Sequence, residues 1–149
     1  MLRIARSLFV VLLGVLSTAG PASAETPAQA AARWGLLGTW RLDCTTPASQ
    51  ANQSFTFAVR EGRLFQDRNL GGDAQDSSPM TQATIRPDGK ILLTTVFSGG
   101  TREAVFMKSD DGRRRRVMSN RGVDTDEYTI RDGLYVSNGQ PTPWSTRCN

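Results

Sequence analysis

The chain has 149 residues, of which 18 are Lys or Arg and 14 are Asp or Glu, and it contains two cysteines and no histidine. This length suits a single domain. The lack of histidine removes the commonest general base and transition-metal ligand and excludes Ser-His-Asp catalysis. No glycine-rich phosphate loop precedes a helix either, so we expect a protein that is not an enzyme and that holds no metal ion or cofactor.

The first 24 residues have the features of a secretory signal peptide. Two arginines precede an apolar run from Leu8 to Leu16, which is too short to span a bilayer as a mature helix. Small residues at the −3 and −1 positions predict cleavage between Ala24 and Glu25. We therefore expect a periplasmic or secreted protein without a stable membrane anchor; the alternatives are a short N-terminal anchor and a chance apolar stretch.

Removal of the signal peptide changes the charge balance. It carries two of the basic residues and none of the acidic ones, so 16 basic residues remain against 14 acidic residues. A nearly balanced charge gives no electrostatic basis for binding nucleic acid. We expect a monomer whose partner is a small molecule or a protein of the cell envelope.

A short helix is predicted at the start of the mature chain, within residues 25–35. Thr26 and Gln29 have the spacing of a capping box, and a proline follows the threonine at the first helical position. The helix can continue for about two turns to Trp34. Gly35 then ends it, because glycine readily takes the left-handed conformation of a C-terminal cap.

Residues 36–149 show strand patterns separated by tight-turn signals such as Glu61-Gly62 and Asn138-Gly139. Apolar and polar residues alternate with the period of two that is typical of strands. The predicted strands are 37–44, 53–60, 63–70, 80–86, 90–97, 101–108, 113–119, 124–131 and 133–137. Short strands joined by hairpins predict an all-β fold, a single antiparallel up-and-down barrel of about 8–9 strands.

The two cysteines, Cys44 and Cys148, lie near the two ends of the mature chain. An even pair in an exported chain predicts a disulfide, with two free thiols or a redox pair as the alternatives. The bond would enclose 103 residues, and the chain-entropy model assigns such a loop about 4–5 kcal/mol of stabilisation. It would place the first and last strands side by side, so we expect a closed barrel.

Acidic side chains gather in two places. Residues from Gly71 to Pro79 are predicted to form a long polar loop at the barrel mouth, with a calcium or ligand loop as the alternative. The aspartates of this loop lack the spacing of an EF-hand. Asp124 and Asp126 belong to a second cluster, which we interpret as turn polarity; a hydrolase that uses these carboxylates is the alternative.

Four consecutive arginines, Arg113-Arg114-Arg115-Arg116, follow a predicted hairpin turn. Successive side chains of a strand point to opposite faces, so two would face outward and two inward if all four lay in a strand. One or two guanidinium groups would then line the barrel mouth, where their planar fork suits a carboxylate or a phosphate. The alternatives are a solvated strand edge and binding to an anionic surface.

Aromatic residues in the predicted strands provide further candidates for ligand binding. A barrel of about eight strands can hold one small ligand or be filled by its own side chains. The aromatic residues that would fill or line the barrel are Phe55, Phe57, Phe65, Phe97, Phe106 and Tyr128. The sequence leaves a hollow and a filled interior both open.

The segment LLGTW, residues 36–40, has the pattern L-x-G-x-W directly after the predicted helix. It resembles the G-x-W signature that opens the first strand of lipocalins and their calycin relatives. The resemblance implies a lipocalin-like, small exported bacterial barrel in which Gly38 and Trp40 close one end. It also implies an arginine near the last strand, Arg147 or Arg131, packed on the indole ring, where a guanidinium gains cation–π attraction.

The same segment resembles the opening of small periplasmic inhibitors of secreted metalloproteases, which are lipocalin-like barrels preceded by an N-terminal segment. That resemblance implies that the free N-terminus, from Glu25 to Pro27, enters a protease cleft. Our first hypothesis is non-enzymatic binding of a small apolar or anionic ligand. Inhibition of a secreted protease or of another envelope enzyme is the alternative.

Overall fold

The computed structural model describes residues 24–148. The predicted signal peptide therefore lies outside the described residues, except for Ala24. The secondary-structure elements are α1 (Pro27–Trp34), β1 (Gly38–Arg41), β2 (Ser54–Arg60), β3 (Arg63–Asn69), β4 (Gln75–Ile85), β5 (Ile91–Phe97), β6 (Gly100–Lys108), β7 (Arg114–Gly122), β8 (Tyr128–Arg131), β9 (Leu134–Tyr135) and β10 (Ser145–Cys148).

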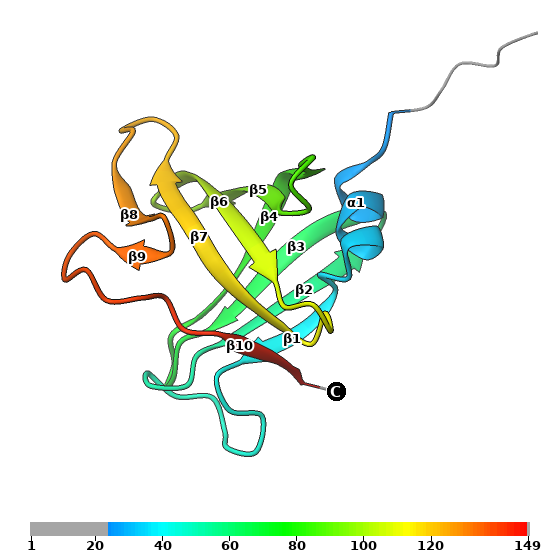
Figure 1. Cartoon of the computed structure of the whole chain (residues 1–149). Coiled ribbons are helices and arrows are strands. Elements are labelled where there is room, and N and C mark those ends of the chain that lie inside the picture. The colour runs from blue at the N-terminus through cyan, green and yellow to red at the C-terminus, as the bar shows by residue number, and fades with distance from the viewer. Residues whose placement is uncertain (1–23, 149) are drawn as a thin grey trace, which may run out of the picture.

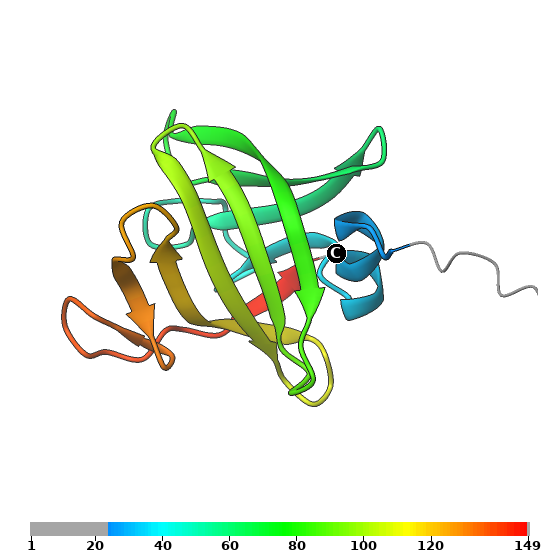
Figure 2. The same ribbon diagram turned by 90° about the horizontal axis from the view of Figure 1, so that it is seen from above.

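Eight of these strands form a closed antiparallel barrel (Figure 1). Each strand from β1 to β7 pairs with the next one in sequence, and β10 closes the ring by pairing with both β1 and β7. The two remaining strands, β8 and β9, extend the sheet from β7 as a hairpin. The predicted all-β, up-and-down barrel is therefore confirmed. Figure 2 shows α1 and the β8–β9 hairpin on opposite sides of the barrel.

A disulfide links Cys44, just after β1, to Cys148 at the end of β10, with their Cα atoms 5.4 Å apart. The predicted disulfide is confirmed. The first and last barrel strands also lie side by side, with Trp40 opposite Arg147 in the register. The bond thus ties together the two strands at which the sheet meets itself.

Helix α1 closes one end of the barrel. Thr26 and Gln29 form the predicted capping box, and Gly35 ends the helix with a φ of 82°. The helix packs against β3 and β4. Ala31 and Trp34 are buried, and the Trp34 indole Nε1 donates a hydrogen bond of 2.8 Å to the carbonyl of Gly89, in the β4–β5 turn.

The apolar core lies at this closed end. It includes the buried side chains of Trp34, Leu36, Trp40, Phe57, Leu64, Met80, Ile91, Leu93 and Phe106. The inward face becomes polar toward the other end of the barrel. Gln66 lies opposite Phe57 on one side and Ser78 on the other, so all three share the inward face. The barrel therefore has an apolar closed end and a polar open end.

The predicted polar loop from Gly71 to Pro79 was wrong, because β4 already begins at Gln75. Asp76 lies directly opposite Arg68 of β3, and the two side chains form a salt bridge. This cross-strand pair extends the sheet through residues with low strand propensity. The predicted strand bounds also missed β10, and the predicted strand 124–131 starts only at Tyr128.

Candidate functional site

Strand β7 pairs with two different strands along one of its edges. This strand pairs with β10 only through Arg114 and Arg115, and farther along it pairs with β8, where Asn120 lies opposite Ile130. Next to this change of partner is a cavity of about 410 Å³, which we call the barrel-mouth cavity. It is lined by the loop between β1 and β2, by strands β2, β3, β6, β7, β8 and β9, and by the start of β10 with the segment before it.

The lining of the barrel-mouth cavity is mixed in character. Its large apolar side chains are Leu42, Phe55, Phe106, Val117, Ile130 and Tyr135. Its polar side chains include Gln66, Arg115, Arg116, Asn120, Thr142 and Ser145. Such a combination of apolar walls with a few polar groups is typical of small-molecule sites.

Arg115 is the one arginine among residues 113–116 whose side chain is buried, with 2% of its surface exposed. It lies opposite Ser145 of β10 and Lys108 of β6. Three aromatic rings surround its guanidinium, whose Cζ is 4.9 Å from the Trp40 centroid, 4.5 Å from Phe57 and 4.6 Å from Phe106. These rings hold the cation by cation–π attraction.

Within residues 24–148, the charge of Arg115 has no acidic partner. Among the described residues, none of the salt bridges involves Arg115. Its Nε and Nη1 atoms are buried and make no hydrogen bond. Burial disfavours the charged form and lowers the pKa of Arg115 to about 9. The group remains a cation at neutral pH.

The two neighbours of Arg115 in β7 differ from it: Arg114 is exposed, and Arg116 is half-buried at the edge of the barrel-mouth cavity. Arg114 and Arg116 place their Cζ atoms 5.5 and 5.6 Å from the centroid of Trp144. Arg116 also donates from Nη2 to the Gly133 carbonyl at 2.8 Å, in the β8–β9 turn, and from Nε to the Thr142 hydroxyl at 3.3 Å, in the segment before β10. Arg113 precedes β7 and is exposed. Of the four consecutive arginines, one therefore faces inward, whereas two were expected to do so. The difference arises because β7 begins at Arg114.

The predicted aromatic residues separate into two groups. Phe55 lines the barrel-mouth cavity, and Phe57 packs edge-on against Phe106 in the core, with centroids 6.4 Å apart. Phe97 and Tyr128 lie elsewhere, and each is covered by an arginine: Arg68 at 4.2 Å and Arg131 at 4.3 Å, respectively. Of the proposed ligand-binding residues, the structure therefore brings Phe55, Arg115 and Arg116 together.

Trp40 and Gly38 lie at the seam of the barrel. The indole Nε1 of Trp40 donates to the Leu36 carbonyl at 2.7 Å, which fixes the ring over the closed end. Its guanidinium partner is Arg115, not Arg147 or Arg131 as the lipocalin resemblance implied. The Arg147 side chain instead covers Gly38, where an added Cβ would lie 3.1 Å from Nε.

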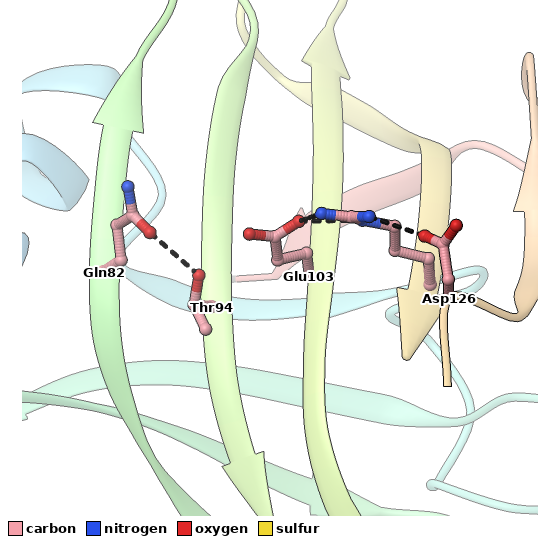
Figure 3. A network of polar contacts seen from close by, with 5 residues as sticks. Gln82, Thr94, Glu103 and Asp126 are labelled. Atoms are coloured by element: carbon pink, nitrogen blue, oxygen red, sulfur yellow. Dashed lines mark hydrogen bonds and ion pairs between the residues drawn. The ribbon is translucent and has the colours of Figure 1, made fainter. Parts of the chain in front are cut away.

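Of the acidic cluster at Asp124 and Asp126, Asp126 takes part in an ion pair on the outer face of the barrel. Arg121 donates to Glu103 at 2.6 Å and to Asp126 at 2.7 Å, and both carboxylates raise its pKa (Figure 3). Farther along the same face, Thr94 donates to Gln82 at 3.1 Å. These groups do not line the barrel-mouth cavity. The described residues contain no group of three or more metal-ligating side chains.

A second hollow of about 470 Å³ lies along β2, β3 and β4. All its lining residues are polar: Ser54, Thr56, Asp67, Arg68, Asn69, Gln75, Asp76 and Ser77. It has no apolar wall that could exclude water from a bound ligand. The barrel-mouth cavity, although slightly smaller, is therefore the better candidate site.

The residues just before α1 are folded onto the helix. Glu25 accepts two hydrogen bonds from Arg33, at 2.7 and 2.6 Å, and the Arg33 guanidinium lowers the pKa of this carboxylate. Thr26 caps the helix. Insertion of this segment into a protease cleft stays a prediction.

Sequence reasoning missed several lining residues of the cavity. Gln66 could have been found from the alternation of β3, because it follows inward-facing Leu64 by two residues. Asn120 follows a shift of register in β6–β7 pairing, and Tyr135 belongs to the β8–β9 hairpin. No local pattern predicts either placement.

Comparisons with protein-family models, with curated proteins and with solved structures found no match for this chain. The fold and the cavity are therefore interpreted from the residues themselves. Within residues 24–148, no helix has the length and apolar character needed to cross a bilayer.

Proposed function

We propose that this chain is an exported, non-enzymatic, lipocalin-like barrel that binds one small apolar or anionic molecule in the barrel-mouth cavity. The observation that carries the proposal is the cavity itself, which reaches from an apolar rim to the barrel interior. Leu42 and Tyr135 at the rim are 45% and 36% exposed. The cavity volume of about 410 Å³ lies within the range of about 300–1,000 Å³ that is usual for ligand sites.

Three further features support this proposal. A disulfide that stabilises the barrel seam fits an oxidising compartment outside the cytoplasm. The signal-peptide pattern of the first residues agrees with export. The barrel is closed, its first strand begins with the L-x-G-x-W pattern, and Trp40 is buried at the end that α1 covers. These features agree with a calycin-type protein.

The proposal is tested by titrating the ¹⁵N-labelled mature protein with octanoate and, separately, with octan-1-ol. We expect at least one compound to shift the amide signals of residues that line the cavity, in a saturable manner. Ala51, an exposed residue of the rim, provides a blocking variant, Ala51→Trp, which should weaken binding at least about tenfold. Ala32→Trp, on the exposed side of α1 at the opposite end, is the matched control and should bind normally. Failure of both compounds to bind would contradict the proposal.

A further inference from the structure

We infer that the ligand of the barrel-mouth cavity carries a carboxylate, which binds to Arg115, and an apolar part that extends toward the rim. This inference rests on the proposed function and specifies the chemical class of its ligand. It is carried by a buried guanidinium that lines the cavity and has unsatisfied hydrogen-bond donors.

The first argument is the charge. An isolated buried ion is unfavourable, so buried charges in proteins are normally paired with an opposite charge. Arg115 is 2% exposed, and the described residues supply no acidic partner. An anion bound in the cavity would provide the missing partner.

The second argument is the direction of the hydrogen bonds. Guanidinium donors lie in the plane of the group, and each N–H can point at an oxygen of a carboxylate. Trp40, Phe57 and Phe106 attract the cation with their ring faces, but these rings supply no oxygen acceptor. They therefore orient the guanidinium and leave Nε and Nη1 without acceptors.

The amides of the cavity wall also favour an anion. The Gln66 carbonyl oxygen already accepts from Thr95 at 3.3 Å, and that of Asn120 accepts from Arg102 at 2.6 Å. The remaining groups of both amides are N–H donors. A ligand that presents oxygen acceptors to this wall complements these donors, whereas an ammonium group would not.

The apolar part of the ligand is indicated by the rest of the lining. Phe55, Val117 and Ile130 line the cavity together with the rim residues Leu42 and Tyr135. At about 30 Å³ for each water-sized atom, a volume of about 410 Å³ has room for about 14 such atoms. A monocarboxylate of about eight to ten carbons therefore fits.

The experiment compares octanoate, octan-1-ol and octylammonium, which share one chain and differ in the charge of the head group. Binding is measured by calorimetry at pH 7.5 to wild type, Arg115→Met, Arg115→Lys and Arg114→Met. Arg114 is the matched control, because it belongs to the same run but lies on Trp144 at the outer face. Near-ultraviolet circular dichroism verifies that each variant is folded.

Wild type and Arg114→Met should bind octanoate at least about tenfold more tightly than octan-1-ol, because a charge-assisted hydrogen bond is worth that much or more. Octylammonium should bind most weakly. Arg115→Met should bind octanoate and octan-1-ol equally, and Arg115→Lys should keep only part of the preference because it lacks the planar guanidinium.

Two results would overturn the inference and are distinguishable from each other. Equal binding of octanoate and octan-1-ol to wild type would leave the cavity a binding site while removing the carboxylate from its ligand. A preference for octanoate that persists in Arg115→Met would place the anion at another residue. Failure of all three compounds to bind wild type would overturn both this inference and the proposed function.

Discussion

Replacing Arg115 with methionine should stabilise the ligand-free protein. Burial lowers the pKa of Arg115 from 12.5 to about 9, and at 1.36 kcal/mol per pKa unit this corresponds to about 5 kcal/mol against the charged form. Three aromatic rings at 4.5–4.9 Å offset part of this cost, at about 1 kcal/mol each. Methionine fills a similar space without charge, so the expected gain is about 2 kcal/mol.

The gain is measured by urea unfolding and by thermal melting of the oxidised protein, residues 25–149, at pH 7.5. About 2 kcal/mol in a domain of this size corresponds to a rise in Tm of about 8 °C. A gain in stability together with a loss of octanoate binding would identify Arg115 as a group retained for function at the expense of stability. An Arg115→Met variant less stable than wild type by 1 kcal/mol or more would refute the reasoning, since Arg115 would then be a structural cation held by its rings.

Three other outcomes are expected. Reducing the disulfide should lower the free energy of unfolding by about 4 kcal/mol without loss of β circular dichroism at low temperature; identical urea midpoints with and without reductant would contradict this. Gly71→Ala should cost about 3 kcal/mol, because φ is 95° and the new Cβ would lie 2.6 Å from the Gln50 nitrogen. Gly72→Ala is the matched control, because φ is 58° and the new Cβ would have no neighbour within 4 Å outside the adjacent residues; it should cost about 1 kcal/mol. Equal urea midpoints for the two variants would contradict the predicted clash at Gly71. The gain in stability from Arg115→Met over wild type should shrink between pH 9 and 11. Because burial lowers the pKa of Arg115, the folded wild type loses this charge at a lower pH than the unfolded chain does. A difference in Tm between the two proteins that stays constant over this range would contradict that.

The sequence predicted the features that depend on local chemistry. The capping box at Thr26 and Gln29 and the glycine cap at Gly35 formed as their spacing implied. The two cysteines predicted closure, because a bond between them requires that the ends of the chain meet. Local signals of this kind are reliable because few other arrangements satisfy the same backbone groups and cross-links.

The features that depend on register could not be predicted. The inward position of Arg115 requires that β7 start at Arg114, and a shift of one residue would have turned a neighbouring arginine, not Arg115, toward Trp40, Phe57 and Phe106. The pairing of β7 with β10 over only two residues, which leaves the barrel mouth beside it, is set by long-range contacts. The strand at Asp76 was missed for the same reason, because its partner Arg68 is on another strand.

The most direct test of this account is a crystal structure of the protein with 8-bromooctanoate, in which the anomalous signal of bromine locates the chain end. The account predicts bromine near the rim at Leu42 and Tyr135 and the carboxylate within hydrogen-bond distance, about 3 Å, of the Arg115 guanidinium. Bromine bound only outside the barrel-mouth cavity, or a carboxylate at the rim with Arg115 still without an acceptor, would contradict it.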